Sequence, residues 1–170
     1  AETVRVRNRH SRDLDRPAAE VAALLSTLGT RDDGLWPVHL WFPMRLDGPP
    51  LVGAAGGHGP VRYHCTERSP DAVTFAFDSI LGSPHWRGFH RFVVVPSARG
   101  SRLVHDLELR ICPWRRLQWA VLVGPLHDAV LEDLLDRARG QVDRLLRELE
   151  LRHGDRAVGR DHHTGDELAL

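Results

Sequence analysis

A long apolar pattern between residues 113 and 151 limits the possible folds of this chain more than any other feature. Apolar residues recur there every three or four positions, at Leu117, Val121, Leu131, Leu134, Leu135, Ala138, Val142, Leu145, Leu146 and Leu149. This spacing places them on one side of a helix. At about 1.5 Å per residue, a helix over residues 116–150 would be roughly 50 Å long. Such a helix needs a large apolar surface to pack against, and the preceding sequence indicates strands.

Alternating polar and apolar residues predict these strands. Residues 3–12 form a half-buried edge strand, with Val4, Val6, Asn8 and His10 facing one side and arginines facing the other. Four further strands are expected over residues 61–66, 73–77, 88–95 and 103–111. A short strand is also expected over 51–55. It would be followed by a tight turn at 56–59, where the Gly-Gly-His-Gly sequence lacks the spacing of a phosphate-binding loop.

The remaining segments connect these strands. Asp15 offers a cap and Pro17 a first turn for a short helix that ends at Gly29. Residues 32–50 and 80–88 contain several aromatic residues, with Pro and Gly, and we expect irregular segments that cover the core or form the mouth of a cavity. Within the long helix, Gly124-Pro125 predicts a kink or a restart. We expect a single domain over residues 1–151 and a flexible polar tail over 152–170.

Composition excludes several classes of function. The 23 basic residues equal the 23 acidic residues in number, so we expect no nucleic-acid partner. All the basic residues are arginine, which excludes Schiff-base chemistry on a lysine. No apolar run predicts a membrane span or a signal peptide, and the two separated cysteines fit the reducing cytoplasm. The eleven histidines show no HExxH spacing and no CxxC pair occurs, so we expect no metal site and no cofactor.

One polar residue, His105, falls on the apolar side of the strand predicted over 103–111. It is either a hydrogen-bonded core histidine or a polar anchor in a ligand cavity, and Tyr63 could share that interior. His90 and Arg91 lie on opposite faces of one strand, and the sequence leaves open which of them faces inward. His127 and Asp128 are expected, with Asp133 and Asp136, to be charges on the helix surface.

The order of these elements resembles the START-like (SRPBCC) superfamily, which includes polyketide cyclases, lipid-transport proteins and the birch-pollen allergen class. The residues that carry this resemblance are DRPAAEVAALLSTL, GFHRFVVVP, LVHDLELRI and WAVLVGPLHDAVLEDLLDRA. The resemblance implies an α+β helix-grip fold, in which a curved antiparallel sheet wraps around a long C-terminal helix. It also implies an apolar cavity between them for a lipid, polyketide or sterol-like ligand.

We therefore predict a protein that binds a hydrophobic or amphipathic small molecule. The residues expected to line its site are Trp41, Tyr63, Phe75, His90, Phe92, His105 and Trp119. One alternative is a cyclase- or aromatase-like enzyme in which His105 and Tyr63 donate or shuttle protons. Another is a regulatory or structural interaction module. The sequence leaves open the ligand, the reaction and the oligomeric state.

Overall fold

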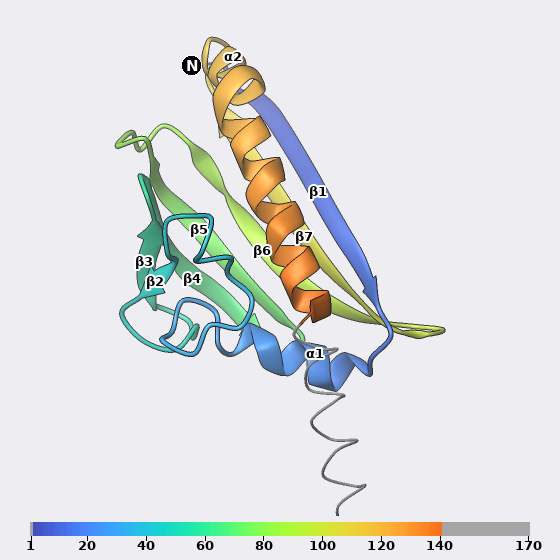
Figure 1. Ribbon diagram of the computed structural model, residues 1–170. Coiled ribbons are helices and arrows are strands. Elements are labelled where there is room, and N and C mark those ends of the chain that lie inside the picture. The colour runs from blue at the N-terminus through green and yellow to red at the C-terminus, as the bar shows by residue number, and fades with distance from the viewer. Residues whose placement is uncertain (1, 141–170) are drawn as a thin grey trace, which may run out of the picture.

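The computed structural model describes residues 2–140, which form one antiparallel sheet, a short helix and a long C-terminal helix (Figure 1). The order of the seven strands in the sheet is β1-β7-β6-β5-β4-β3-β2. The strands are β1 (Val4–Leu14), β2 (Arg45–Leu46), β3 (Ala55–His58), β4 (Val61–Ser69), β5 (Ala72–Ile80), β6 (Arg87–Ser97) and β7 (Gly100–Ile111). This is the predicted helix-grip fold: the sheet lies against the long helix, and α1 (Ala18–Leu25) crosses one end.

The five strands predicted from alternation are confirmed and correspond to β1, β4, β5, β6 and β7. β1 is an edge strand, as expected, and pairs with β7 along its whole length. Arg5, Arg7 and Arg9 lie on its outer face, where Arg5 and Arg7 form ion pairs with Glu108 of β7 at 2.5 and 3.4 Å. The inner face of β1 is turned toward the C-terminal helix.

The prediction for residues 51–59 was wrong. No strand lies over 51–55 alone; instead Gly56, Gly57 and His58 belong to β3, and the turn follows at Gly59. The glycines allow close pairing of three strands, since a Cβ at Gly57 would meet the backbone carbonyl of Val61. A glycine pair that looks like a turn in the sequence therefore marks a crowded strand.

Replacing Gly57 by alanine should lower the free energy of unfolding by about 1–3 kcal/mol, because the added methyl group forces β3 and β4 apart. Urea denaturation followed by circular dichroism measures this change. Gly48→Ala is the matched control, since no atom lies within 4 Å of a Cβ at that position. Equal stabilities for the two variants would contradict the close pairing.

The short helix α1 has the predicted position but a different start. Pro17 is its N-cap residue and no side chain caps it, so the expected capping role of Asp15 was wrong. Proline at the start of a helix loses no hydrogen bond, because the first N–H groups have no partner within the helix. Val21 and Leu25 point into the core, and the chain turns at Gly29 with a φ of 72°.

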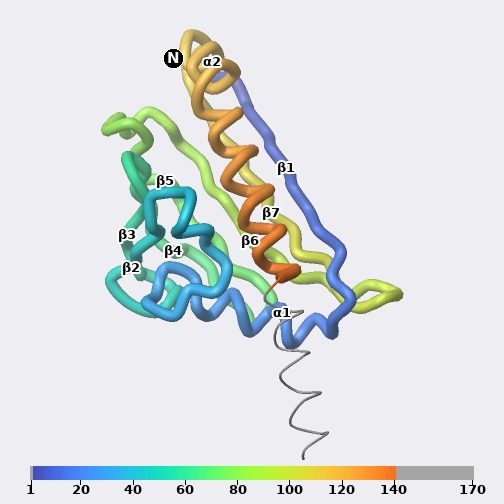
Figure 2. The backbone as a smooth tube through the Cα atoms, viewed as in Figure 1, coloured from blue at the N-terminus to red at the C-terminus, as the bar shows by residue number. Residues whose placement is uncertain are grey.

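The C-terminal helix comprises α2 (Arg115–Gln118), a π-helical turn η1 (Trp119–Val123) and α-helical residues 124–140. The helix runs through Gly124-Pro125 without a restart, and the irregularity next to this pair is a π-helical turn that ends just before it (Figure 2). Pro125 lacks an N–H and would clash with the carbonyl four residues earlier. The preceding turn is wider, with Gly124 N–H bonded to the Trp119 carbonyl, and this accommodates the proline.

The apolar stripe of this helix is buried only in its later turns. Leu131, Leu134, Leu135 and Ala138 are buried as predicted, whereas Leu117 and Val121 are 68% and 67% exposed. The prediction for the first turns was therefore wrong, and the positions from 142 onward, with the predicted domain boundary at 151, lie outside the described residues. Between residues 2 and 140, no helix has the length and apolar character needed to cross a membrane.

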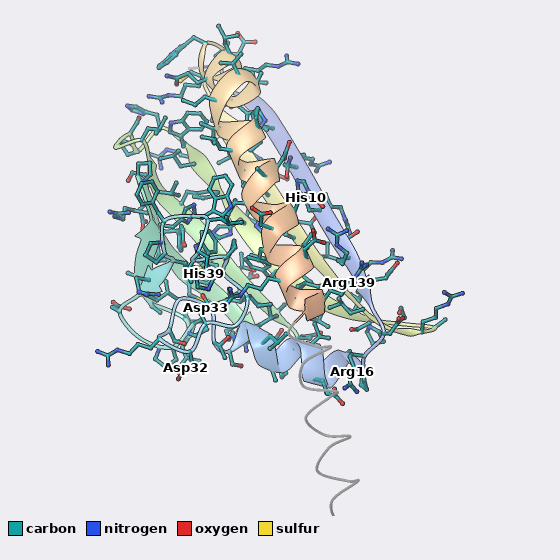
Figure 3. All side chains as sticks on the ribbon, in the orientation of Figure 1. His10, Arg16, Asp32, Asp33, His39 and Arg139 are labelled. Atoms are coloured by element: carbon teal, nitrogen blue, oxygen red, sulfur yellow. The ribbon has the colours of Figure 1, made fainter. Side chains whose placement is uncertain are left out.

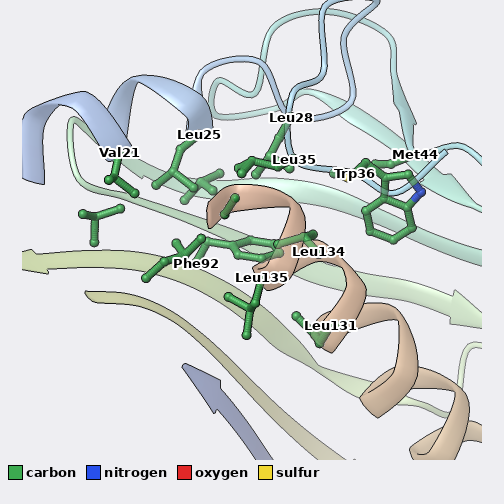
Figure 4. Close-up of a cluster of buried hydrophobic side chains, with 14 of the residues drawn as sticks. Val21, Leu25, Leu28, Leu35, Trp36, Met44, Phe92, Leu131, Leu134 and Leu135 are labelled. Atoms are coloured by element: carbon green, nitrogen blue, oxygen red, sulfur yellow. The ribbon is translucent and has the colours of Figure 1, made fainter. Parts of the chain in front are cut away.

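Two separate hydrophobic clusters fill the space between sheet and helix. The larger cluster lies near α1 and joins the later turns of the C-terminal helix to the sheet (Figure 4). The smaller cluster lies near the start of that helix and contains Val6, Ile80, Trp86, Leu107, Leu109 and Ile111. The aromatic residues of the irregular segments mostly plug the core, since Trp36 and Trp86 are buried, while Phe42 is 72% exposed.

Candidate functional site

A layer of imidazoles lies between the sheet and the C-terminal helix. We call it the histidine layer and define it as His10 of β1, His105 of β7, His90 of β6 and His127 of the C-terminal helix. His10 and His105 are direct partners in the β1–β7 register, so both face the helix. Figure 3 shows His10 between β1 and the helix. Strand alternation thus brings residues from both ends of the chain to one level of the sheet.

The rings contact one another across the sheet. His105 Nε2 lies 3.3 Å from His90 Nδ1, and the ring centroids of His105 and His127 are 5.1 Å apart. His127 is also 6.0 Å from the ring of His10. Since these histidines lie within contact distance of each other, a proton or a polar ligand bound at one changes the electrostatics of the next.

Tyr63 of β4 extends the layer toward the opposite edge of the sheet. Its ring lies 4.9 Å from that of His90, and its hydroxyl lies 3.1 Å from His58 Nδ1. Phe75 and Phe77 of β5 stack on His90 at centroid distances of 5.2 and 5.0 Å. The layer is therefore polar at its nitrogens and aromatic on its ring faces.

Burial keeps His58, His90, His105 and His127 uncharged. Desolvation lowers the pKa of His90 and of His105 well below 6.5, and the neighbouring histidines lower both further. Desolvation also lowers the pKa of His58 and of His127 to about 4. Burial raises the pKa of Tyr63, so its phenol stays protonated. At neutral pH each of these four rings has one N–H donor and one nitrogen acceptor.

Three of the buried ring nitrogens have no hydrogen-bond partner within residues 2–140: His90 Nε2, His105 Nδ1 and His127 Nδ1. A buried polar group without a partner costs about 1–3 kcal/mol. His127 Nδ1 is 3.9 Å from Asp128 Oδ1, which is too far for a hydrogen bond. These nitrogens can therefore bond to a polar group of a guest molecule.

The structure brings together five of the residues predicted to line a ligand site: Tyr63, Phe75, His90, Phe92 and His105. His90 is the inward residue of β6, and Arg91 points to solvent, which decides the register that the sequence left open. Trp119 is half-buried with its ring 5.9 Å from His127. Trp41 lies in the irregular segment before β2 and contacts a later turn of the C-terminal helix, where its Nε1 donates to Asp133 Oδ2 at 2.7 Å.

The expected hollow interior is absent around the buried members of this group within residues 2–140. Tyr63 and Phe75 are 0% exposed and His105 is 1% exposed, so no space of water size adjoins them. A shallow pocket of about 120 Å³ lies instead on the outer face of the sheet, lined by Glu67, Arg68, Ser69, Ala72, Thr74 and Arg91. Side chains from both layers thus occupy the space in which a ligand was expected.

Sequence reasoning missed His10 and His127 as parts of the site. The prediction that His127 is a surface charge was wrong, because its side chain is only 15% exposed. The available signal was its position four residues before Leu131, on the buried side of the helix. His10 was predicted to face inward, but nothing in the sequence paired it with His105. Trp114, just before the C-terminal helix, is 60% exposed.

Comparison with known proteins gives likeness in structure alone. A scan against protein-family models finds no match, and a search of the curated proteins finds no significant relative. A point mutant of norcoclaurine synthase from Thalictrum flavum, in complex with a transition-state analogue, is similar with a TM-score of 0.65 and 15% identity. The match covers 85% of this chain and 98% of that one.

Two further solved structures agree. A protein from Thermobifida fusca solved by NMR has a TM-score of 0.58 and 19% identity over 83% of this chain and 94% of that one. Norcoclaurine synthase with dopamine and hydroxybenzaldehyde has a TM-score of 0.56 and 14% identity over 86% of this chain and 88% of that one. The chain therefore has the START-like helix-grip fold.

Proposed function

We propose that this protein binds a small amphipathic molecule at the histidine layer, between the sheet and the C-terminal helix. The single observation that carries this proposal is the set of buried ring nitrogens without a partner, next to stacked aromatic side chains. The likeness to norcoclaurine synthase supports it, since one structure of that enzyme holds the small aromatic molecules dopamine and hydroxybenzaldehyde. The proposal is argued from the residues of the site, because a shared fold does not by itself define a ligand.

The chemistry of the layer favours a neutral ligand with a hydroxyl or carbonyl group on an aromatic body. Neutral imidazoles donate or accept single hydrogen bonds and offer no positive charge to a carboxylate. Arg91 is exposed on the opposite face of β6, so it offers no positive charge to an acidic ligand in the layer. This also favours a neutral ligand. Among the ligand classes implied by the fold, a hydroxylated aromatic molecule of the polyketide type fits better than a fatty acid.

Binding requires the interior to open, since side chains fill it. Half-buried Val61 and Phe77 of the sheet pack against both hydrophobic clusters, and half-buried Trp119 and Val123 of the π-helical turn pack against the smaller cluster beside them. A π-helical turn is a local irregularity of the kind found at functional sites. We place the opening between these four residues, with the helix turn moving away from β4 and β5.

Binding of 2-naphthol should exceed binding of naphthalene by about tenfold, because one hydrogen bond to an imidazole contributes about 1–1.5 kcal/mol. Isothermal titration calorimetry measures both affinities. His105→Phe should remove the difference while keeping the affinity for naphthalene. His85→Gln, in an exposed loop, is the control.

Native mass spectrometry of the protein purified from its own host would identify the natural ligand. Two results together would reject the proposal: no retained small molecule, and no saturable binding of either probe. Equal affinities of the two probes would reject the role of the histidines while leaving an apolar site.

A second candidate function is proton-transfer catalysis of the cyclase or aromatase type. It is favoured by the contact between the Tyr63 hydroxyl and His58, at 3.1 Å, beside the His90–His105 pair. A protonated Tyr63 could donate to a developing enolate, and a neutral histidine could accept a proton. If this is the function, His105→Ala should abolish turnover of the natural ligand while preserving its binding.

A further inference from the structure

A second group of side chains lies at the β1 end of the histidine layer and points to a metal ion. It consists of His10 on β1 and His127 and Asp128 on the C-terminal helix. One ligand atom from each, a ring nitrogen or a carboxylate oxygen, lies within 4.8 Å of the others. Imidazole and carboxylate groups in this number are typical ligands of divalent transition metals.

His10 lies between two carboxylates of the C-terminal helix. Its Nδ1 lies 2.8 Å from Glu132 Oε1, and its Nε2 lies 3.0 Å from Asp128 Oδ1. A neutral imidazole has a single N–H and can donate to only one of these carboxylates. With Nδ1–H directed at Glu132, the His10 Nε2 lone pair faces the Asp128 carboxylate, and a metal ion between them would accept both.

We propose that His10 Nε2, a ring nitrogen of His127 and Asp128 Oδ1 bind a divalent transition-metal ion of the zinc class. In a tetrahedral zinc site, ligand atoms about 2.0–2.1 Å from the ion lie about 3.3 Å from each other. The 3.0 Å between His10 Nε2 and Asp128 Oδ1 is close to this separation. Three protein ligands leave a position for water or for a small ligand.

Neighbouring residues hydrogen-bond to the proposed ligands and would orient them toward the ion. Glu132 would accept the Nδ1–H of His10, which leaves Nε2 free for the ion. Arg12 in turn holds Glu132 through an ion pair of 2.7 Å. Asn8 Nδ2 donates to Asp128 Oδ1 at 2.7 Å and orients that carboxylate. Two of the three ligands thus have their own hydrogen-bonded partner.

The third ligand, His127, is available for coordination. Its Nδ1 is buried and has no hydrogen-bond partner within residues 2–140. The ring centroids of His127 and His10 are 6.0 Å apart, so both imidazoles can reach one ion. The proposed ligands come from a strand and a helix that are more than 100 residues apart, so no short ligand spacing such as HExxH marks them. For this reason the sequence predicted no metal site.

Cobalt(II) titration of the full chain tests this site, because protein-bound cobalt absorbs visible light according to its ligands. One equivalent should bind with the intense d–d bands of four- or five-coordinate cobalt, and zinc should displace it. Asp128→Asn and His127→Gln should each weaken binding by more than about 100-fold, and Glu132→Gln by roughly 10- to 100-fold. Asp128→Asn retains the shape of the side chain and so decides the outcome if His127→Gln fails to fold.

Matched controls separate this site from other histidines of the chain. His64→Gln removes an exposed histidine–aspartate pair, formed with Asp78 at 2.8 Å, and should leave cobalt binding unchanged. The adjacent His162 and His163, which lie outside the described residues, are replaced by alanine in a further variant. The site is rejected if cobalt fails to bind, or if binding survives Asp128→Asn or disappears with the His162/His163 substitution. This inference shares His127 with the proposed function, but cobalt binding and naphthol binding are measured separately, so either one can fail alone.

Discussion

Replacing Leu134 by alanine should lower the free energy of unfolding by about 3 kcal/mol. Leu134 is 0% exposed and belongs to the larger hydrophobic cluster that joins the C-terminal helix to the sheet. Removing a buried leucine side chain costs about 2–5 kcal/mol, because it loses the transfer free energy and leaves a cavity. A domain of this size has a total stability of about 5–15 kcal/mol, so the loss should be plain in urea denaturation.

The control for this prediction is Leu126→Ala, two turns earlier on the same helix. Leu126 is 50% exposed, and we expect a change of no more than about 0.5 kcal/mol. If the two variants lost equal stability, the helix would not be packed on the sheet as described. A loss at Leu126 alone would show that a different face of the helix is buried.

The architecture follows from features that act over short distances in the sequence. Alternation along residues 103–111 placed Leu103, His105 and Leu107 on the inner face, and the structure confirms all three. The three-and-four spacing from Leu131 to Ala138 likewise indicated the buried side of the helix. These patterns succeed because burial of one face is the dominant local constraint on a strand or helix.

The errors arose where contacts between distant segments override local preference. Gly56 and Gly57 resemble a turn, yet they lie in β3 because two neighbouring backbones approach them closely. Leu117 and Val121 fit an apolar stripe, but the described sheet and loops leave them exposed. Neither outcome can be derived from periodicity, since both depend on which surfaces meet in three dimensions.

The candidate site was predictable only in part for the same reason. His105 and Tyr63 stood out as polar residues on otherwise apolar strand faces, and the structure places both inside. The partners of His105 come from β6 and from a helix more than twenty residues later, and a sequence does not reveal this pairing. The interior around them is also better filled than the resemblance implied, because side-chain volumes rather than fold class decide whether a cavity remains.

Lowering the pH from 7 to 4.5 should unfold this protein, because its buried histidines are neutral in the folded state. The pKa of His58 and of His127 is lowered to about 4, against about 6.5 in an unfolded chain, and burial lowers the pKa of His90 and of His105 further. Below pH 6.5 the unfolded state therefore binds more protons than the folded state, so stability is full above this pH and falls with acidity.

The size of this acid effect follows from the number of histidines. Each contributes a loss of about 1.4 kcal/mol per pH unit, so His58 and His127 alone remove about 5 kcal/mol by pH 4.5, a large share of a typical total stability. Carboxylates with a lowered pKa, such as Asp128 and Glu132, act in a lower window: the stability they contribute is lost only below about pH 4. Urea midpoints measured at pH 7, 6 and 5 give the slope.

His105→Gln should make this slope shallower by about 1.4 kcal/mol per pH unit, because it removes one proton-binding group that is buried in the neutral form. The matched control is His85→Gln, in the exposed loop before β6, which should leave the slope unchanged. Equal stability at pH 7 and pH 5 in the unmodified protein would contradict a layer of buried neutral imidazoles. A slope that His105→Gln leaves unchanged would instead assign the acid sensitivity to groups outside the layer.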